Sequence, residues 1–207
     1  MSGVPTELLD LFARWVHLIA GIMWIGNSLL FNWLDRRLES PDGITRTPAP
    51  RGIIWLLHSG GFYYVEKTLL DGTPMPRPVH WFKWQAYTTW WSGTLLLLAV
   101  YYLGGRALLT ESGNSTGTIA LAAGGIVAGW LLYEAVQRVL APRLPRAAAV
   151  LWIGGLAAIA RMFLTQLSGR AAFLHVGAML GTIMAGNVVF TIVPSQRELV
   201  RSVQQGR

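Results

Sequence analysis

The sequence predicts an all-α integral membrane protein, a single domain over residues 1–207 built as a bundle of about five transmembrane helices. Three observations predict this class. Charged residues make up only 13% of the chain, against about 25% in soluble domains. Hydrophobic residues make up 53% and gather in runs long enough to cross a bilayer. Ten tryptophans suit the aromatic belts at membrane interfaces.

Five apolar runs supply the predicted spans, at about 11–33, 84–103, 118–140, 147–164 and 171–193. A sixth apolar segment, 52–67, is short and interrupted by glycines. Because non-helical backbone at membrane depth must be covered by protein, we predict that this segment is re-entrant or lies on the surface. It belongs to a connection over 34–83, and a sixth span there is the alternative.

The basic residues predict the orientation of the bundle. With five spans, the connection after the first run, the connection after the third run and the C-terminal tail share one side. Lys and Arg concentrate there, and the positive-inside rule places that side in the cytoplasm and the N-terminus outside. Because these residues lie between apolar runs, nucleic acid is excluded as a partner. The residues counted are Arg36, Arg37, Arg46, Arg51, Lys67, Arg77, Lys83, Arg138, Arg143, Arg146, Arg197, Arg201 and Arg207, against Arg106, Arg161 and Arg170 on the other side.

The absence of cysteine excludes every site that depends on a thiol or a thiolate. Disulfides, thiolate metal sites, iron–sulfur clusters and covalently attached c-type haem are excluded. Histidine remains the strong ligand for a metal or a haem, and there are four: His17, His58, His80 and His175.

His17 and His175 are predicted to lie at similar depth, because both are near the start of a run that begins outside. Two imidazoles at one depth can be the axial ligands of a b-type haem iron. Gly21, one turn after His17, leaves space for a flat macrocycle, and Arg14, one turn before, can hold a haem carboxylate. The alternative is that each histidine only forms hydrogen bonds between helices.

Two further groups are candidates for a site. His80 and Lys83 lie among aromatic residues where the second run begins. They suit a planar anionic substrate or another haem, or simple anchoring at the interface. His58 adjoins two glycines, and Glu66 follows closely; they can complete a pocket or fix a surface segment. His58, Glu66 and Lys83 are therefore the catalytic candidates.

Other polar and small residues in the runs predict packing. Glu134 and Arg138 are spaced to form an ion pair, with a proton relay as the alternative. Asn27 and Asn187 are predicted to form hydrogen bonds between helices. Small residues at a four-residue spacing predict close helix contacts. They are Gly177, Gly181 and Ala185 in the fifth run, and Gly125 and Gly129 in the third.

Four segments together resemble a known family. They are "RWVHLIAGIMWIGNSLLFNWLD", "HSGGFYYVEK", "VHWFKWQAYTTWWSG" and "HVGAMLGTIMAGNVVFTIVPSQR". In this order they are similar to the membrane domain of bacterial cytochrome c-type urate oxidases, also called urate hydroxylases. The first segment is also similar, more weakly, to membrane proteins that carry b haem. The resemblance implies a multi-pass redox protein of the bacterial inner membrane.

In that family, eight spans precede a cytochrome c domain, and electrons from urate pass to its haem. Five spans and no cysteine imply a truncated relative without that domain. Electrons are then expected to leave to a separate partner, a cytochrome c or a larger membrane complex. The positions that match the family's motifs imply functional roles for His17, His58, His80, His175, Arg14, Glu66 and Lys83.

Two functions of different classes follow. The first is a redox protein that binds haem b, with His17 and His175 as ligands of the iron. The second is a non-catalytic transmembrane subunit of a larger respiratory or photosynthetic complex. A transporter is less favoured, since no clear inverted repeat is present.

Overall fold

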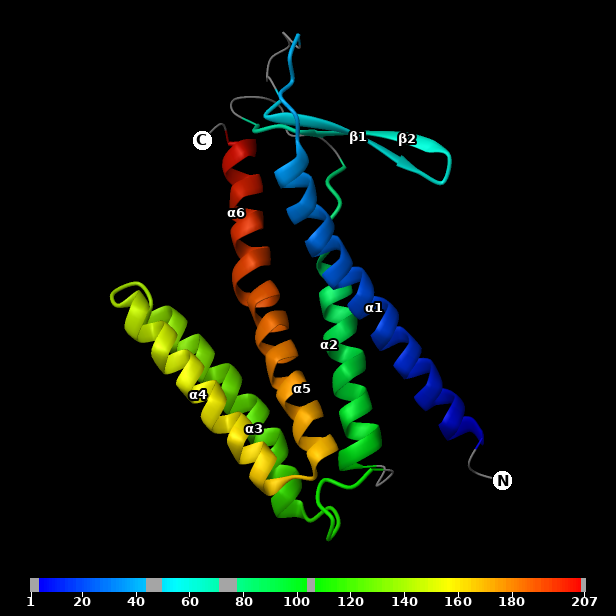
Figure 1. The fold of residues 1–207 in the computed structure, drawn as a ribbon, viewed down its shortest axis with the longest axis vertical. Helices are drawn as coiled ribbons and strands as arrows, with labels where there is room; N and C mark the ends of the chain where they lie inside the picture. Colours follow the sequence, from blue (N-terminus) through cyan, green and yellow to red (C-terminus); the bar gives the residue numbers. More distant parts are fainter. Residues whose placement is uncertain (1–3, 44–49, 71–77, 104–106, 206–207) are drawn as a thin grey trace.

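The structure is a computed structural model that describes residues 4–43, 50–70, 78–103 and 107–205. This part of the chain forms five long helical rods and one β-hairpin (Figure 1). The predicted all-α bundle is therefore confirmed. Four of the arginines that were counted to predict the orientation lie outside the described residues: Arg46, Arg77, Arg106 and Arg207.

Each of the five apolar runs coincides with one rod, and the run 84–103 extends one residue past the end of its rod. The rods are α1 (Val4–Arg37), α2 (Lys83–Leu97) with a π-helical turn (Leu98–Tyr102), α3 (Thr116–Ala135) with a π-helical turn (Val136–Leu140), α4 (Pro145–Gln166), and α5 (Gly169–Asn187), which continues through a π-helical turn (Val188–Ile192) into α6 (Val193–Gln204). Within the described residues, four rods are long and apolar enough to cross a membrane. The α2 rod is not one of them, and its first three turns hold mainly polar and aromatic residues.

Local sequence signals explain where the helices begin. The Ser115 hydroxyl accepts a hydrogen bond from the Thr118 N–H, 3.1 Å away, and so caps α3. Pro145 occupies the first turn of α4, where its missing N–H costs nothing. Pro194 lies inside the α5–α6 rod just after a π-helical turn, where the backbone adapts to the lost donor.

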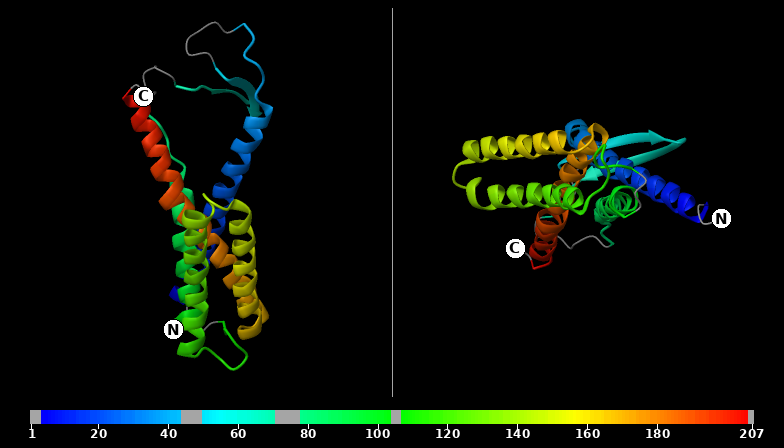
Figure 2. Two further views of the ribbon diagram at one scale, coloured as in Figure 1. Left: turned by 90° about the vertical axis from the view of Figure 1, so that its left-hand side faces the viewer. Right: turned by 90° about the horizontal axis from the view of Figure 1, so that it is seen from below.

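The rods form two groups that meet at α5. Helices α1 and α2 pack side by side, and α2 also contacts α5. The antiparallel pair α3 and α4 packs on α5 (Figures 1 and 2). The buried core lies in this second group and includes Phe163, Met179 and Ala172, each 0% exposed. The N-terminus lies towards one end of the bundle, and the C-terminus towards the other.

Residues 52–67 form a β-hairpin, so the alternative of a sixth membrane-spanning helix is wrong for this segment. Strand β1 (Gly52–His58) pairs antiparallel with β2 (Gly61–Lys67), with Trp55 opposite Tyr64. The turn consists of Ser59 and Gly60, whose φ angles are 50° and 76°. Two positive φ values characterise the tight hairpin turn that matches strand twist. The hairpin lies across the end of the bundle near the C-terminus (Figure 1).

Several predicted contacts are confirmed. Asn187 donates a hydrogen bond to the Tyr133 hydroxyl at 2.7 Å, which links α5 to α3. Glu134 and Arg138 form an ion pair at 2.6 Å. Gly125 and Gly129 lie against side chains of neighbouring helices. The prediction is wrong for Gly177 and Gly181, which face open space.

Gly125→Ala is expected to destabilise the protein by about 1–3 kcal/mol, because a Cβ there would lie 2.6 Å from two ring atoms of the buried Phe163. The neighbouring Gly124 is a matched control, since nothing lies within 4 Å of a Cβ at that position. Gly124→Ala should leave stability unchanged or raise it by up to about 1 kcal/mol through helix propensity. Thermal unfolding followed by circular dichroism in detergent measures both, and equal melting temperatures would contradict the tight α3–α4 contact.

Candidate functional site

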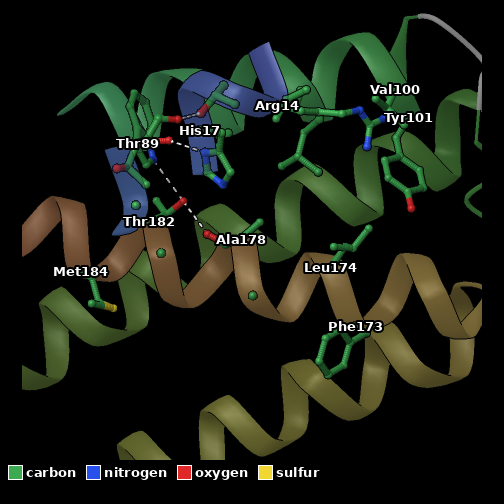
Figure 3. Close-up of a pocket in the computed structure, with 18 of the residues that line it drawn as sticks. Arg14, His17, Thr89, Val100, Tyr101, Phe173, Leu174, Ala178, Thr182 and Met184 are labelled. Carbon is green, nitrogen blue, oxygen red and sulfur yellow. Dashed lines mark hydrogen bonds between the residues drawn. The ribbon is translucent and has the colours of Figure 1, made fainter. Parts of the chain in front are cut away.

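A cavity of about 500 Å³ lies between α1, α2 and α5, and we call it the His17 cavity (Figure 3). This volume falls within the range of small-molecule sites in proteins. The wall is mostly apolar, with His17 from α1 among its few polar residues. Its other members include Gly21, Trp24, Thr89, Gly93, Tyr101, Arg170, Leu174, Gly177, Ala178, Gly181 and Met184.

The hydrogen bonds of His17 determine its tautomer. Its Nδ1 lies 2.9 Å from the backbone carbonyl of Thr89 (Figure 3). The same nitrogen lies 3.2 Å from the Ser92 hydroxyl. A carbonyl oxygen only accepts, so Nδ1 carries the proton and donates it. The Ser92 hydroxyl donates to the Thr88 carbonyl at 2.6 Å, which leaves its oxygen free to accept. Nε2 therefore carries a lone pair, and within the described residues no hydrogen bond involves it.

Small residues create the space around this imidazole. A Cβ at Gly93 would lie 2.8 Å from His17 Cε1, so only glycine lets α2 approach the ring this closely. Across the cavity, Gly177 and Gly181 on α5 have open space where a side chain would be. The arrangement leaves a gap between the imidazole and the backbone of α5.

One group of cavity residues carries positive charge. Arg14 and Arg170 are both in the wall, and Arg14 also donates from Nε to an Asp10 carboxylate oxygen at 3.0 Å. Tyr101, 3% exposed, belongs to the same wall, and its buried hydroxyl has no partner within the described residues. These groups suit a ligand that carries carboxylates.

His175 does not line the His17 cavity, so the predicted pairing of His17 with His175 is not seen. Its ring is 0% exposed and lies against Tyr101, Tyr102 and Phe163. Nδ1 donates to the Ala171 carbonyl at 2.7 Å. Nε2 therefore accepts from the Tyr102 hydroxyl, at 2.9 Å. Both nitrogens are in use, and ordinary side chains fill the space around the ring.

A second cavity, of about 640 Å³, lies between α1, the segment before α2, and α6, and we call it the Lys83 cavity. It contains two of the predicted site residues, His80 and Lys83. Its wall also holds Asn27, whose amide donates to Gln85 at 2.8 Å and confirms the predicted link between helices. Trp24 belongs to the walls of both cavities.

A family model described as "Urate oxidase N-terminal" matches residues 4–207, nearly the whole chain. The chain belongs to the urate oxidase N-terminal family. Neither a curated protein nor a solved structure matches it. The expected resemblance to a urate oxidase membrane domain is thereby confirmed.

This member of the urate oxidase N-terminal family has a donor set that fits a haem held by one histidine. His17 offers an unpartnered Nε2, and the Gly93 position lacks the Cβ that would crowd the ring. The donor set does not fit ligation by His17 and His175 together, because Tyr102 occupies Nε2 of the latter. The described residues contain no cluster of three or more His, Asp or Glu for a metal ion.

His58 and Glu66 belong to the hairpin and are not part of either cavity. His58 is exposed beside the turn, so it does not join His80 and Lys83 as predicted. Glu66 accepts a hydrogen bond from the Thr68 hydroxyl at 2.7 Å. Of the three catalytic candidates, Lys83 alone lines one of these two cavities.

Sequence reasoning missed four residues that shape these sites in this urate oxidase N-terminal family member. Thr89 and Gly93 position His17, Tyr102 binds His175, and Gln85 binds Asn27. A signal existed for Gln85, which is a polar residue inside the predicted span 84–103. For Thr89 there was none, because its backbone carbonyl makes the contact.

Proposed function

We propose that this protein is a membrane redox protein that binds one b-type haem in the His17 cavity through His17. In this proposal it lies in a bacterial inner membrane with its N-terminus outside, as the basic residues predict. Electrons pass to a separate partner, a cytochrome c or a larger membrane complex. The proposal revises the predicted ligand set from two histidines to one. It keeps Arg14 for a carboxylate and adds Arg170, which lies in the same cavity wall.

The observation that carries the proposal is the unpartnered Nε2 of His17. A ligand histidine commonly donates its other ring N–H to a backbone carbonyl, which fixes the ring and raises its basicity. The bond from His17 Nδ1 to the Thr89 carbonyl is of this kind. A polar imidazole in a helix that can cross a membrane is costly, and function is the usual reason for it.

The other residues of the His17 cavity have separate roles in this proposal. When bound, a haem supplies one-electron exchange between ferric and ferrous iron. Thr89 and Ser92 hold the imidazole of His17 in one orientation. Arg14 and Arg170 supply charge for two carboxylates. Both arginines are exposed, so these charged contacts lie at the rim of the cavity and the apolar wall surrounds the ring of the ligand.

The test is a reduced-minus-oxidised absorption spectrum of the full chain, produced with haem supplied and purified in mild detergent. We expect b-type bands and a stoichiometry of one haem per chain by the pyridine haemochrome assay. A protein that is folded by circular dichroism and shows no such bands would remove the redox assignment.

Gly93→Ala is expected to weaken haem binding by about 10–100-fold, the usual effect of disturbing a group that orients a metal ligand. The physical reason is the 2.8 Å separation between a Cβ at this position and His17 Cε1, which pushes the ring off the Thr89 carbonyl. Gly26 on α1 is the control, because nothing lies within 4 Å of a Cβ there and it is not in the cavity wall. Haem titration followed by absorbance compares the two, and equal affinities would show that the His17 ring is not held as described.

A non-catalytic transmembrane subunit of a larger complex is the second candidate. The observation that favours it is the exposure of α1, since only 6% of the residues in its apolar window are buried. Lipid or helices of other subunits must cover this surface. Native mass spectrometry after mild solubilisation distinguishes the two, because a stable stoichiometric complex without haem in this chain favours the subunit.

A further inference from the structure

The β-hairpin is joined to the helices at its base, and neither strand packs closely along a helix within the described residues. Ile53 and Glu39 exchange two backbone hydrogen bonds, of 2.9 and 3.1 Å, just after the end of α1. The Lys67 ammonium forms an ion pair with Asp35 of α1 at 2.7 Å. An isolated two-stranded hairpin is only marginally stable in water, so the strands beyond this base need a further partner.

One face of the hairpin is apolar and open, and we call it the Trp55 face. Residues directly opposite one another in an antiparallel pair point to the same side of the sheet. Trp55 lies opposite Tyr64, and Leu57 lies opposite Phe62. All four side chains are exposed, and the rings of Trp55 and Tyr64 are in contact, with centroids 5.1 Å apart. A contiguous exposed patch of large apolar side chains marks an interaction surface.

The composition of the hairpin favours lipid as the partner. No Asp, Glu, Lys or Arg occurs between Gly52 and Val65, and the charged Glu66 and Lys67 lie at the base. Tryptophan and tyrosine are enriched where a membrane meets water, because their rings combine an apolar body with a polar group. Charge at the base and aromatic rings beyond it are typical of a segment at the membrane interface.

The point of attachment places the hairpin at the depth of the lipid head groups. Helix α1 is long and apolar enough to cross a membrane, and it ends with the exposed Arg36 and Arg37. Arginines at the end of a membrane helix lie at the interface with water. Asp35 and Glu39, which join the hairpin to α1, lie on either side of these arginines in the sequence.

The direction of the hairpin continues the lipid-facing surface of α1. Only 6% of the residues in the apolar window of α1 are buried, so this helix faces lipid over most of its length. The strands run across the direction of the rods and extend away from α5 and α6, on the side of the bundle where α1 lies (Figures 1 and 2). The hairpin therefore projects over the membrane surface beside α1.

We propose that the hairpin is an interfacial anchor, whose Trp55 face enters the lipid leaflet beside α1. The face reaches about 5–10 Å into the boundary between head groups and acyl chains, the usual depth of interfacial amphipathic segments. The strand edges stay among the head groups, because unpaired backbone groups are not exposed to hydrocarbon. The anchor does not depend on a haem in the His17 cavity.

The experiment uses the absence of cysteine, which allows a single fluorescent label at a chosen position of the full chain. Phe62→Cys places the label on the Trp55 face. Tyr63→Cys is the matched control, because neighbouring residues of a strand point to opposite faces. The native side chains are 74% and 53% exposed, so neither substitution disturbs a core. Each variant is labelled with bimane in phosphatidylcholine nanodiscs, with or without bromine atoms near the start of the acyl chains.

Bromine in the lipid is expected to quench the label at Phe62→Cys about twofold or more over the label at Tyr63→Cys, and iodide in the water to show the reverse order. Leu57→Cys should behave as Phe62→Cys does, and replaces it if that variant fails to fold, because the two residues are directly opposite on one face. Equal quenching of the two faces by bromine overturns the proposal. A Phe62→Cys label protected from both quenchers also overturns it, and identifies protein, such as a second copy of the chain, on the Trp55 face.

Discussion

His17→Ala is expected to abolish the b-type absorption bands, with a loss of haem affinity on the order of 100-fold or more. The variant removes the only histidine in the wall of its cavity, within the described residues. The side chain is half-buried, and its Thr89 partner is a backbone carbonyl that the remaining structure can hydrate. The fold should therefore survive, and the spectrum of the folded variant is the measurement.

The matched control for this result is His80→Ala, which removes an exposed imidazole from the other cavity. That variant should keep the bands at full height. Imidazole added to His17→Ala should restore part of the absorbance, because the free ligand can occupy the vacated space. Unchanged bands in His17→Ala would show that His17 is not a haem ligand. The non-catalytic transmembrane subunit would then be the favoured function.

His175→Ala is expected to destabilise the protein by about 3 kcal/mol, and so to act on the fold and not on a ligand. The ring is 0% exposed and packs against two tyrosines and Phe163. Its removal leaves a cavity and removes the hydrogen-bond acceptor of the half-buried Tyr102 hydroxyl, which donates to Nε2 in the native protein. Thermal unfolding in detergent measures the loss.

A double-mutant cycle with Tyr102→Phe separates the hydrogen bond from the packing. We expect a coupling of about 0.5–3 kcal/mol between the two residues, since they are in direct contact. Additive effects would show that the 2.9 Å contact contributes nothing to stability. A His175→Ala protein that kept its melting temperature but lost haem would contradict the structural role.

The sequence predicted the helices well because membrane helices carry strong signals. Run lengths alone located all five rods, and polar residues in apolar surroundings predicted the contacts of Asn27 and Asn187. The hairpin at 52–67 was missed although a signal was present. Strand-forming residues such as Ile53 and Tyr64 flank the two-residue turn Ser59–Gly60. The apolar side chains on both strand faces resembled a membrane segment instead.

The pairing of His17 with His175 failed for a different reason. Run boundaries give the depth of a residue but not the direction in which its helix face points. On α5, Ala171, His175 and Met179 recur every four residues, and all three are 0% exposed. Their shared face packs into the core, while Gly177 and Gly181 face the cavity. The four-residue spacing from His175 to Met179 was the available signal of core packing.

The α5–α6 rod has a length that bears on which molecules can reach the Lys83 cavity. Its 36 residues correspond to about 54 Å, whereas the hydrocarbon of a bilayer is about 30 Å thick. The α3–α4 pair, with spans of 25 and 22 residues, matches that thickness and packs beside α5. If the hydrocarbon layer is centred on α3 and α4, the α6 end of the α5–α6 rod extends into the head-group layer. The residues of α6 that line the Lys83 cavity then lie outside the hydrocarbon, so a ligand need not cross it to reach them.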